Sequence, residues 1–232
     1  MRRPLFLRSM SAQLSSRQAA LMAKSAAEKI RSQHARLSEL DCACGDGDHG
    51  TTMLRIVDRV EKGVDACSNA ALRLVLEQTG WQVLGSDGGA SSSLLGTFAL
   101  GMAQSLPEGR AYADCRELGD ALEAGLINVR RHTPAQLGDK TLLDALIPAV
   151  TAFSAAADVG KNFEAALRDA AAAAQAGAQA TAALTARFGR GRLLGDKTRG
   201  HQDPGAATVA LLFAGFYSGL QEPEGGNDDG RY

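Results

Sequence analysis

Three aspartates lie close together in one short, glycine-containing segment, and their side chains are suited to binding a metal ion. Asp41, Asp46 and Asp48 all fall within residues 41–50, where a compact turn could direct the three carboxylates to one centre. Hard oxygen ligands of this kind suit Mg²⁺, Mn²⁺ or Ca²⁺. Because carboxylates so close together repel one another and the segment contains no Lys or Arg, we interpret it as a metal site. A solvated helix connection rich in turn-forming residues is the competing interpretation.

The spacing of this segment excludes an EF-hand calcium site but does not exclude a zinc site. In an EF-hand beginning at Asp46, the obligatory glycine would be Thr51 and the closing glutamate would be Val57, so the calcium-loop pattern fails. Zinc is the alternative ion, with Cys42, Cys44 and His49 as its ligands. Residues two apart in a short loop rarely reach one tetrahedral centre. The carboxylates therefore favour a hard divalent ion over zinc.

A glycine- and serine-rich segment, 85–93, precedes an apolar stretch and is suited to holding a phosphate. Gly88 and Gly89 allow the backbone to approach a ligand closely, and Ser91 adds a hydroxyl at an expected helix N-terminus. Free N–H groups and the helix dipole favour phosphate there. Ordinary helix capping is the alternative. The segment is not a P-loop, because no Gly-Lys-Ser/Thr closes it and no strand leads into it.

Two further polar segments lie at the starts of predicted helices. Asp203 and Pro204 are typical of an N-cap and a first helical residue. The basic residues just upstream could compensate the charge that develops on a transferred phosphoryl group, with a solvated basic loop as the alternative; they are Arg190, Arg192, Lys197, Arg199 and His201. Near 138–141, Lys140 and Asp144 are four residues apart, which predicts an ion-paired helix start. The string Leu-Gly-Asp-Lys-Thr occurs at 137–141 and again at 194–198, which we attribute to chance.

The elements that must position these segments are predicted to be helices. Hydrophobic residues make up 45% of the chain but aromatic residues only 5%, and the apolar content comes mainly from Ala and Leu, which is typical of packed helices. Apolar spacing predicts eight helices and no strand, at about 11–40, 51–67, 69–84, 94–106, 115–131, 140–156, 161–187 and 204–220. We expect one domain over 11–220, a flexible extension at 1–10 and a disordered tail at 221–232.

Charge and cysteine usage narrow the class of protein. The formal net charge of -1 gives no overall field that would attract nucleic acid or an anionic membrane. No segment has the roughly 20 uninterrupted apolar residues that cross a bilayer. The four cysteines lack the paired spacing of a zinc site and are too few for a disulfide scaffold. We therefore expect a cytoplasmic protein that binds neither nucleic acid nor membrane. Trp81 is expected in the core, and His34 and His132 at the surface.

Four strings follow one another in a set order along the chain. They are Asp41 with Gly45-Asp46-Gly47-Asp48-His49-Gly50, then Gly88-Gly89-Ala90-Ser91, then Gly138-Asp139-Lys140-Thr141 with Asp144, and finally Gly189-Arg190 with Gly200-His201-Gln202-Asp203-Pro204-Gly205-Ala206. Together they resemble the nucleotide-binding L subunit, or C-terminal domain, of dihydroxyacetone kinases. The resemblance covers about 11–220. It implies an all-α antiparallel barrel of eight helices that binds ATP or ADP at one rim through two Mg²⁺ ions.

The resemblance also implies roles for individual residues. Asp41, Asp46 and Asp48 would bind the metal ions and, with Arg190, would be catalytic. The nucleotide would contact His49, Gly50, Thr51, Thr52, Ala90, Ser91, Ser92, Leu142, Arg190, Asp203, Pro204 and Gly205. The chain departs from the commoner family pattern at Thr52, Ser92, Ser93, Leu142, Leu193 and Lys197. These departures leave the three aspartates intact.

In this family the sugar binds to a different module, the K subunit or domain. The resemblance therefore implies a kinase subunit that needs a K partner to phosphorylate dihydroxyacetone or a related small ketose or polyol. Some L subunits use ATP directly, whereas others keep ADP as a coenzyme that a phosphotransferase-system protein recharges; the motifs are common to both. A regulatory nucleotide-binding module that controls a partner protein is the alternative function.

Overall fold

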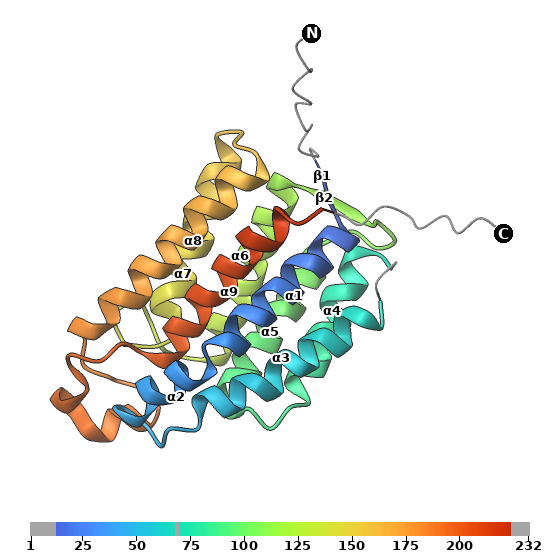
Figure 1. Ribbon diagram of the computed structural model, residues 1–232. Helices are drawn as coiled ribbons and strands as arrows, with labels where there is room; N and C mark the ends of the chain where they lie inside the picture. Colours follow the sequence, from blue (N-terminus) through green and yellow to red (C-terminus); the bar gives the residue numbers. More distant parts are fainter. Residues whose placement is uncertain (1–12, 68–69, 224–232) are drawn as a thin grey trace, which may run out of the picture.

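The computed structural model describes residues 13–67 and 70–223, which fold almost entirely into helices (Figure 1). The expected extension at 1–10 and most of the expected tail at 221–232 lie outside this part of the chain. Within it there are nine α-helices: α1 (Ser16–Ser32), α2 (His34–Cys42), α3 (His49–Asp65), α4 (Leu72–Leu84), α5 (Gly89–Ser105), α6 (Cys115–His132), α7 (Leu143–Asp158), α8 (Phe163–Ala180) and α9 (Pro204–Leu220).

Eight of these helices form a closed antiparallel barrel. Starting from α1, the helices α3, α4, α5, α6, α7 and α8 each pack against the next, and α9 packs against both α8 and α1, which closes the ring. Figure 1 shows the helices running alternately up and down, with α2 extending from the lower end of α1. The predicted all-α, eight-helix fold is thereby confirmed. The long first helix was predicted without its break at Gln33.

The prediction that the chain contains no strand was wrong. β1 (Gln13–Ser15) pairs antiparallel with β2 (Tyr112–Asp114), with Leu14 opposite Ala113. Each strand has only three residues, which is too short to give a recognisable alternation in the sequence. The two central residues, Leu14 and Ala113, are buried. The pair joins the start of α1 to the start of α6 at the upper end of the barrel.

Side-chain caps fix several helix starts. Asp114 and Glu117 form a reciprocal capping box at α6, and the side chains of Asn162 and Asp203 accept backbone N–H groups at the starts of α8 and α9. Because Pro204 follows its cap directly, α9 has the bounds that the sequence predicts. Several other predicted bounds were wrong. The helix expected at 94–106 begins earlier, at Gly89, and the helix expected at 161–187 ends at Ala180, before the 3₁₀ turn η1 (Thr181–Ala183).

Apolar faces turn inward around one core. On α4 the buried positions Val75, Thr79 and Val83 recur every four residues, which is the spacing of one helix face. Trp81 lies on the opposite face and is 58% exposed, so its expected place in the core was wrong. His34 and His132 lie at the surface, as expected. No helix in the described ranges is long and apolar enough to cross a membrane.

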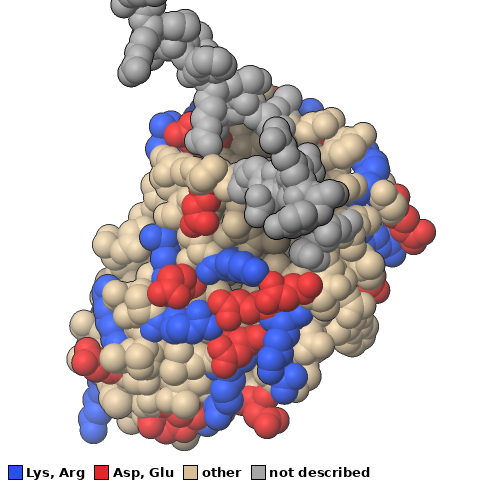
Figure 2. All heavy atoms as spheres, turned by 45° about the vertical axis from the view of Figure 1, so that its right-hand side comes forward, with Lys and Arg blue, Asp and Glu red and all other residues tan. Residues whose placement is uncertain are grey.

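Acidic and basic side chains are interleaved on the face that Figure 2 displays, which agrees with the near-zero net charge. Ion pairs also join α1 to α3, since Arg31 contacts both Asp58 and Glu61. At the Arg31 guanidinium these carboxylates raise the pKa further above its already high value. Surface pairs of this kind add little to stability, so the barrel depends on the packing of its interior.

Close contact between α1 and α9 gives a test of this packing. A Cβ added to Gly215 would lie 2.2 Å from the Cα of Ala26, so Gly215→Ala forces two backbones apart. We expect the free energy of unfolding to fall by about 1–3 kcal/mol. Gly119→Ala is the control, because its nearest neighbours would be 3.7 Å away; it should be neutral or stabilising by up to about 1 kcal/mol. Urea unfolding measures both, and equal losses would contradict the prediction.

Candidate functional site

Four loops gather at the lower end of the barrel and enclose a cleft. They connect α2 to α3, α4 to α5, α6 to α7, and α8 to α9. Successive barrel helices run in opposite directions, so every second connection falls at the same end (Figure 1). The cleft has a volume of about 630 Å³ and takes lining residues from all four loops. The four strings singled out in the sequence therefore meet in one place.

The three aspartates converge at one side of this cleft. One carboxylate oxygen of each of Asp41, Asp46 and Asp48 lies within 4.8 Å of the others. The turn that brings them together needs glycine twice. A Cβ on Gly45 would lie 2.3 Å from Asp41 Oδ1, and Gly47 has a φ of +79°, a backbone conformation that glycine adopts readily. Spacing and ligand chemistry both suit a hard divalent cation.

Arg190 supplies a positive charge that the acidic segment itself lacks. Its Nη1 donates to Asp46 Oδ1 and, at 3.4 Å, to Asp48 Oδ1. Arg190 opens the 3₁₀ segment η2 (Arg190–Thr198) and belongs to the loop between α8 and α9. Three carboxylates facing one guanidinium leave two negative charges, which a divalent cation would balance. Of the predicted basic cluster, Arg190 is the member on the cleft wall, whereas Arg199 bonds to Thr185 outside it.

His49 is a structural link at the floor of the cleft. Its ring is buried, which lowers its pKa and favours the neutral form. Nε2 lies 2.8 Å from Thr208 Oγ1, and that hydroxyl donates to Pro204 O. Because the hydroxyl proton is already used, His49 Nε2 carries the ring proton and donates to Thr208. Among the described residues, only the three aspartates have ligand atoms spaced for a metal ion. The alternative zinc site is therefore not supported.

Most of the predicted metal ligands and nucleotide contacts line the cleft. Those that do are Asp41, Asp48, His49, Thr52, Ala90, Ser91, Leu142, Arg190, Asp203, Pro204 and Gly205, while Asp46 lies at the rim in its ion pair with Arg190. The structure places three predicted residues elsewhere. Gly50 packs against the backbone of His34, and Thr51 faces solvent. Ser92 bonds to the carbonyls of Ser86 and Gly89 and so stabilises the loop from within.

Several lining residues were missed in the sequence. Arg55 lines the cleft and bonds through Nη2 to Thr52 Oγ1; its position one turn after Thr52 was the available signal. Leu94, Ala135 and Phe188 add an apolar wall beside Leu142. These residues come from three different loops and helices, and no short motif marks them. Cys44 also lines the cleft and is buried, which raises the pKa of its thiol.

Lys140 does not pair with Asp144 as predicted. The Asp144 carboxylate accepts the backbone N–H groups of Gly138 and Thr141. Lys140 has a φ of +61° and therefore cannot begin a helix, so α7 starts at Leu143. Its ammonium is directed instead to the carbonyl oxygens of Thr181, at 2.6 Å, and His201.

The sequence matches the DAK2 domain family over residues 43–218. It is 35% identical over 176 residues to the ADP-binding subunit DhaL of PEP-dependent dihydroxyacetone kinase from Escherichia coli (strain K12), covering 76% of this chain and 83% of that protein. It is 32% identical over 189 residues to the ADP-binding subunit DhaL of PTS-dependent dihydroxyacetone kinase from Lactococcus lactis, covering 80% of this chain and 88% of that protein.

One similar solved structure is the dihydroxyacetone kinase from C. freundii in complex with AMP-PNP and Mg²⁺. It superposes with a TM-score of 0.66 at 27% identity, covering 86% of this chain and 33% of that chain. The chain thus spans about a third of that kinase. The superposition agrees with the all-helical architecture described above.

The N-cap of α9 generates a pH prediction. Burial raises the pKa of Asp203 to about 7, against the opposing effects of the Ala206 N–H and Lys140. The folded chain thus keeps this proton up to about pH 7, while the unfolded chain loses it near pH 3.9. The stability that the proton provides is therefore present at low pH and lost as the pH rises through 7.

Asp203→Asn keeps a good N-cap acceptor without the charge. In the absence of nucleotide we expect it to match the parent near pH 4 and to be more stable at pH 8, by about 1–2 kcal/mol after allowance for partial exposure. Urea unfolding at both pH values measures this difference. A parent that is as stable as the variant at pH 8 would refute the assignment.

Proposed function

The chain belongs to the DAK2 domain family, and from this premise we propose that it is the nucleotide-binding subunit of a dihydroxyacetone kinase, acting with a separate sugar-binding subunit. One observation carries the proposal: three converging carboxylates and Arg190 belong to a cleft of about 630 Å³ whose lining also includes the apolar residues Leu94, Ala135, Leu142 and Phe188. Such a cleft can hold a metal-bound polyphosphate at one side and a base at the other. The names of the two DhaL relatives support ADP as the nucleotide.

We assign the phosphates to the acidic side of the cleft. Asp41, Asp46 and Asp48 would hold two Mg²⁺ ions, which neutralise phosphate oxygens and orient the phosphoryl group when bound. The N-terminus of α5 lines the same cleft and presents backbone N–H groups near Ala90 and Ser91, whereas the His49 N–H at the start of α3 donates to Asp41 Oδ2. Free N–H groups at a helix start favour phosphate. Arg190 would stabilise the charge that develops on the transferred group.

We assign the adenine to the apolar side. Leu94, Ala135, Leu142 and Phe188 line it, and an aromatic ring with aliphatic neighbours suits a flat base. Asp203 to Gly205 also line the cleft, and a Cβ on Gly205 would lie 3.3 Å from Leu142 Cβ. Phosphates and base would thus occupy the described cleft, and we place the acceptor sugar on the partner subunit, as the word subunit in the relatives' names supports.

Metal-dependent nucleotide binding is the first test. We expect Mg–ADP to stabilise the parent, by about 2.7 kcal/mol at a concentration of 100 times its dissociation constant. Asp46→Ala and Asp48→Ala should lose most of this shift, because each removes a metal ligand and leaves less charge to hold the ion. Asp120→Ala, an exposed aspartate of α6, is the control and should keep it. Thermal melts with Mg–ADP, and with EDTA in place of Mg²⁺, measure all four proteins.

If the melting temperature of the parent shows no magnesium-dependent shift with ADP, the proposal is contradicted. If nucleotide binds but no phosphoryl group reaches dihydroxyacetone when a sugar-binding subunit and a phosphoryl donor are supplied, the result favours the alternative function, a regulatory module that controls a partner protein.

We propose that exposed residues on two of the loops that line the cleft form the docking surface for the sugar-binding subunit. Leu193 is 86% exposed and Leu137 is 59% exposed. Their loops are joined by a hydrogen bond from Arg187 N–H to Asp139 O. Exposed Arg192 and Lys197 lie on the same loop as Leu193, and exposed apolar groups among arginines are typical of protein interfaces. We assign this surface to an acidic patch of the partner around its sugar site, since phosphoryl transfer requires contact here.

Leu193→Glu introduces a negative charge into this surface. We expect it to weaken subunit binding about tenfold or more while Mg–ADP binding stays within about twofold, because Leu193 is not part of the cleft wall. Val159→Glu is the matched control: Val159 is 74% exposed and follows α7 at the opposite end of the barrel. Surface plasmon resonance with the purified partner measures the affinities. Equal affinity for both variants would argue against the surface.

A further inference from the structure

Lys140 combines two features that are unusual for a lysine. Only 2% of its surface is exposed. Among the described residues it is the only one other than glycine that has a positive φ. Long cationic side chains are seldom buried without partners, and a left-handed backbone at such a residue persists only where surrounding contacts impose it. Both features therefore point to a specific task for the ammonium group.

The ammonium binds both ends of the loop that carries Arg190. Lys140 Nζ donates to Thr181 O, where the segment leaves α8, and to His201 O, just before it enters α9. The segment 181–201 leaves the barrel between these two carbonyls and returns to it. Arg190 lies inside the segment, with its guanidinium on Asp46 and Asp48. One side chain from the loop between α6 and α7 thus closes the neck of another loop.

Few other contacts hold this neck. Gly200 N–H donates to Ala182 O, and Asp203 N–H donates to Thr181 Oγ1. Both cross the same neck, because each links residues 181–182 to residues 200–203. Besides the contacts of Arg190 with Asp46 and Asp48, the segment is connected to the rest of the cleft by Lys140, by the Arg187–Asp139 backbone bond and by the ion pair of the same two residues. Removing the ammonium would leave the buried carbonyl of Thr181 without this donor, which is costly enough for the neck to rearrange.

We propose that Lys140 is a positioning residue that helps to close the neck of segment 181–201 and so holds Arg190 against Asp46 and Asp48. The proposal rests on the function proposed above for Arg190, but the clasp itself does not depend on nucleotide. Lys140 also lines the cleft, but both hydrogen bonds of its ammonium are to backbone carbonyls at the ends of the segment, so it acts on Arg190 through the backbone.

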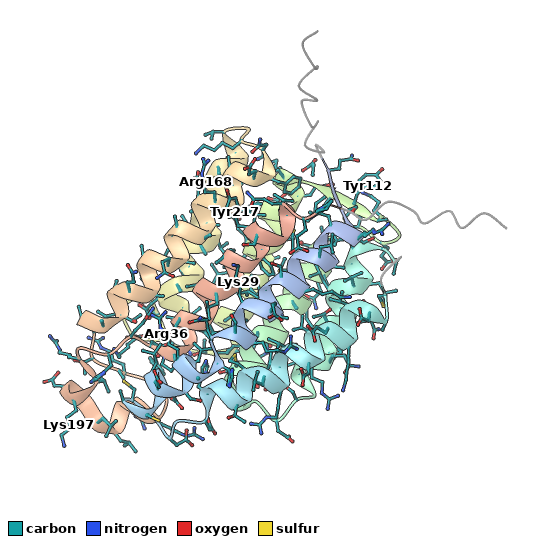
Figure 3. All side chains as sticks on the ribbon, in the orientation of Figure 1. Lys29, Arg36, Tyr112, Arg168, Lys197 and Tyr217 are labelled. Carbon is teal, nitrogen blue, oxygen red and sulfur yellow. The ribbon has the colours of Figure 1, made fainter. Side chains whose placement is uncertain are left out.

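The chain contains its own control. Lys197 occupies the same place in the second Leu-Gly-Asp-Lys-Thr string and lies on the very segment in question. It is exposed, and Figure 3 shows it at the outer edge of the molecule, directed away from the barrel. Lys197→Met therefore removes the same charge from the same sequence without touching the neck.

Hydrogen–deuterium exchange of the free protein tests the clasp without nucleotide or partner. In Lys140→Met we expect the amides of 184–200 to exchange about tenfold faster or more, because the loop opens at lower cost, and in Lys197→Met to stay within about twofold of the parent. Unchanged exchange in Lys140→Met would overturn the proposal, whatever the protein binds. If Lys140→Met does not fold, Lys140→Gln, which keeps a shorter donor, takes its place with the same expected direction.

Kinetics with the sugar-binding subunit then test the link to Arg190. We expect Arg190→Ala to lower kcat about 10²–10³-fold, and Lys140→Met to lower it about tenfold with the KM for sugar within about twofold, since the sugar site lies elsewhere. The double variant should match Arg190→Ala within about threefold, because groups that act as a unit are not additive. Effects that multiply would show that Lys140 acts independently of Arg190 and would overturn the proposal. Failure of Mg–ADP to bind the parent would refute the function but leave the exchange result intact.

Discussion

Three carboxylates within 4.8 Å of one another repel strongly, and the short turn that carries them cannot offset that repulsion alone. Its glycines at 45 and 47 provide room and backbone freedom but no charge. The positive charge comes from Arg190, on a loop far along the sequence. The site is therefore stable only if two distant loops are held together. The barrel, the helix caps and the closed neck of segment 181–201 all help to hold these two loops together.

The up-and-down barrel meets this requirement by geometry. Alternating helix directions place the connections after α2, α4, α6 and α8 at one end. Closure of the ring by α1 and α9 fixes how far apart those connections can lie, and Gly215 allows these two helices to approach closely. His49, bonded to Thr208 across the floor, ties α3 to α9 at the same end. Rigid packing far from the cleft thus sets the spacing of charges within it.

Much of this could be predicted from the sequence, because helix period and caps are local signals. The bounds of α9 follow from Asp203 and Pro204, and the acidic turn follows from its composition. What failed depends on tertiary structure. Trp81 is apolar, but the inner face of α4 is taken by Val75, Thr79 and Val83. The pairing of Lys140 with Asp144 assumed helical backbone from residue 140, and the positive φ there is imposed by contacts with distant loops.

The repeated Leu-Gly-Asp-Lys-Thr string shows how far local sequence determines structure. In the copy at 137–141 the lysine is buried and Thr141 N–H bonds to Asp144. In the copy at 194–198 the threonine is the buried residue: Thr198 Oγ1 donates to Gly195 O and accepts from Ala186 N–H, while Lys197 faces solvent. Glycine has a positive φ in both copies, so the local sequence determines the turn. Which residue of the string is buried depends on the surrounding structure. A lysine acquires a role at this site only where two carbonyls from another loop reach it.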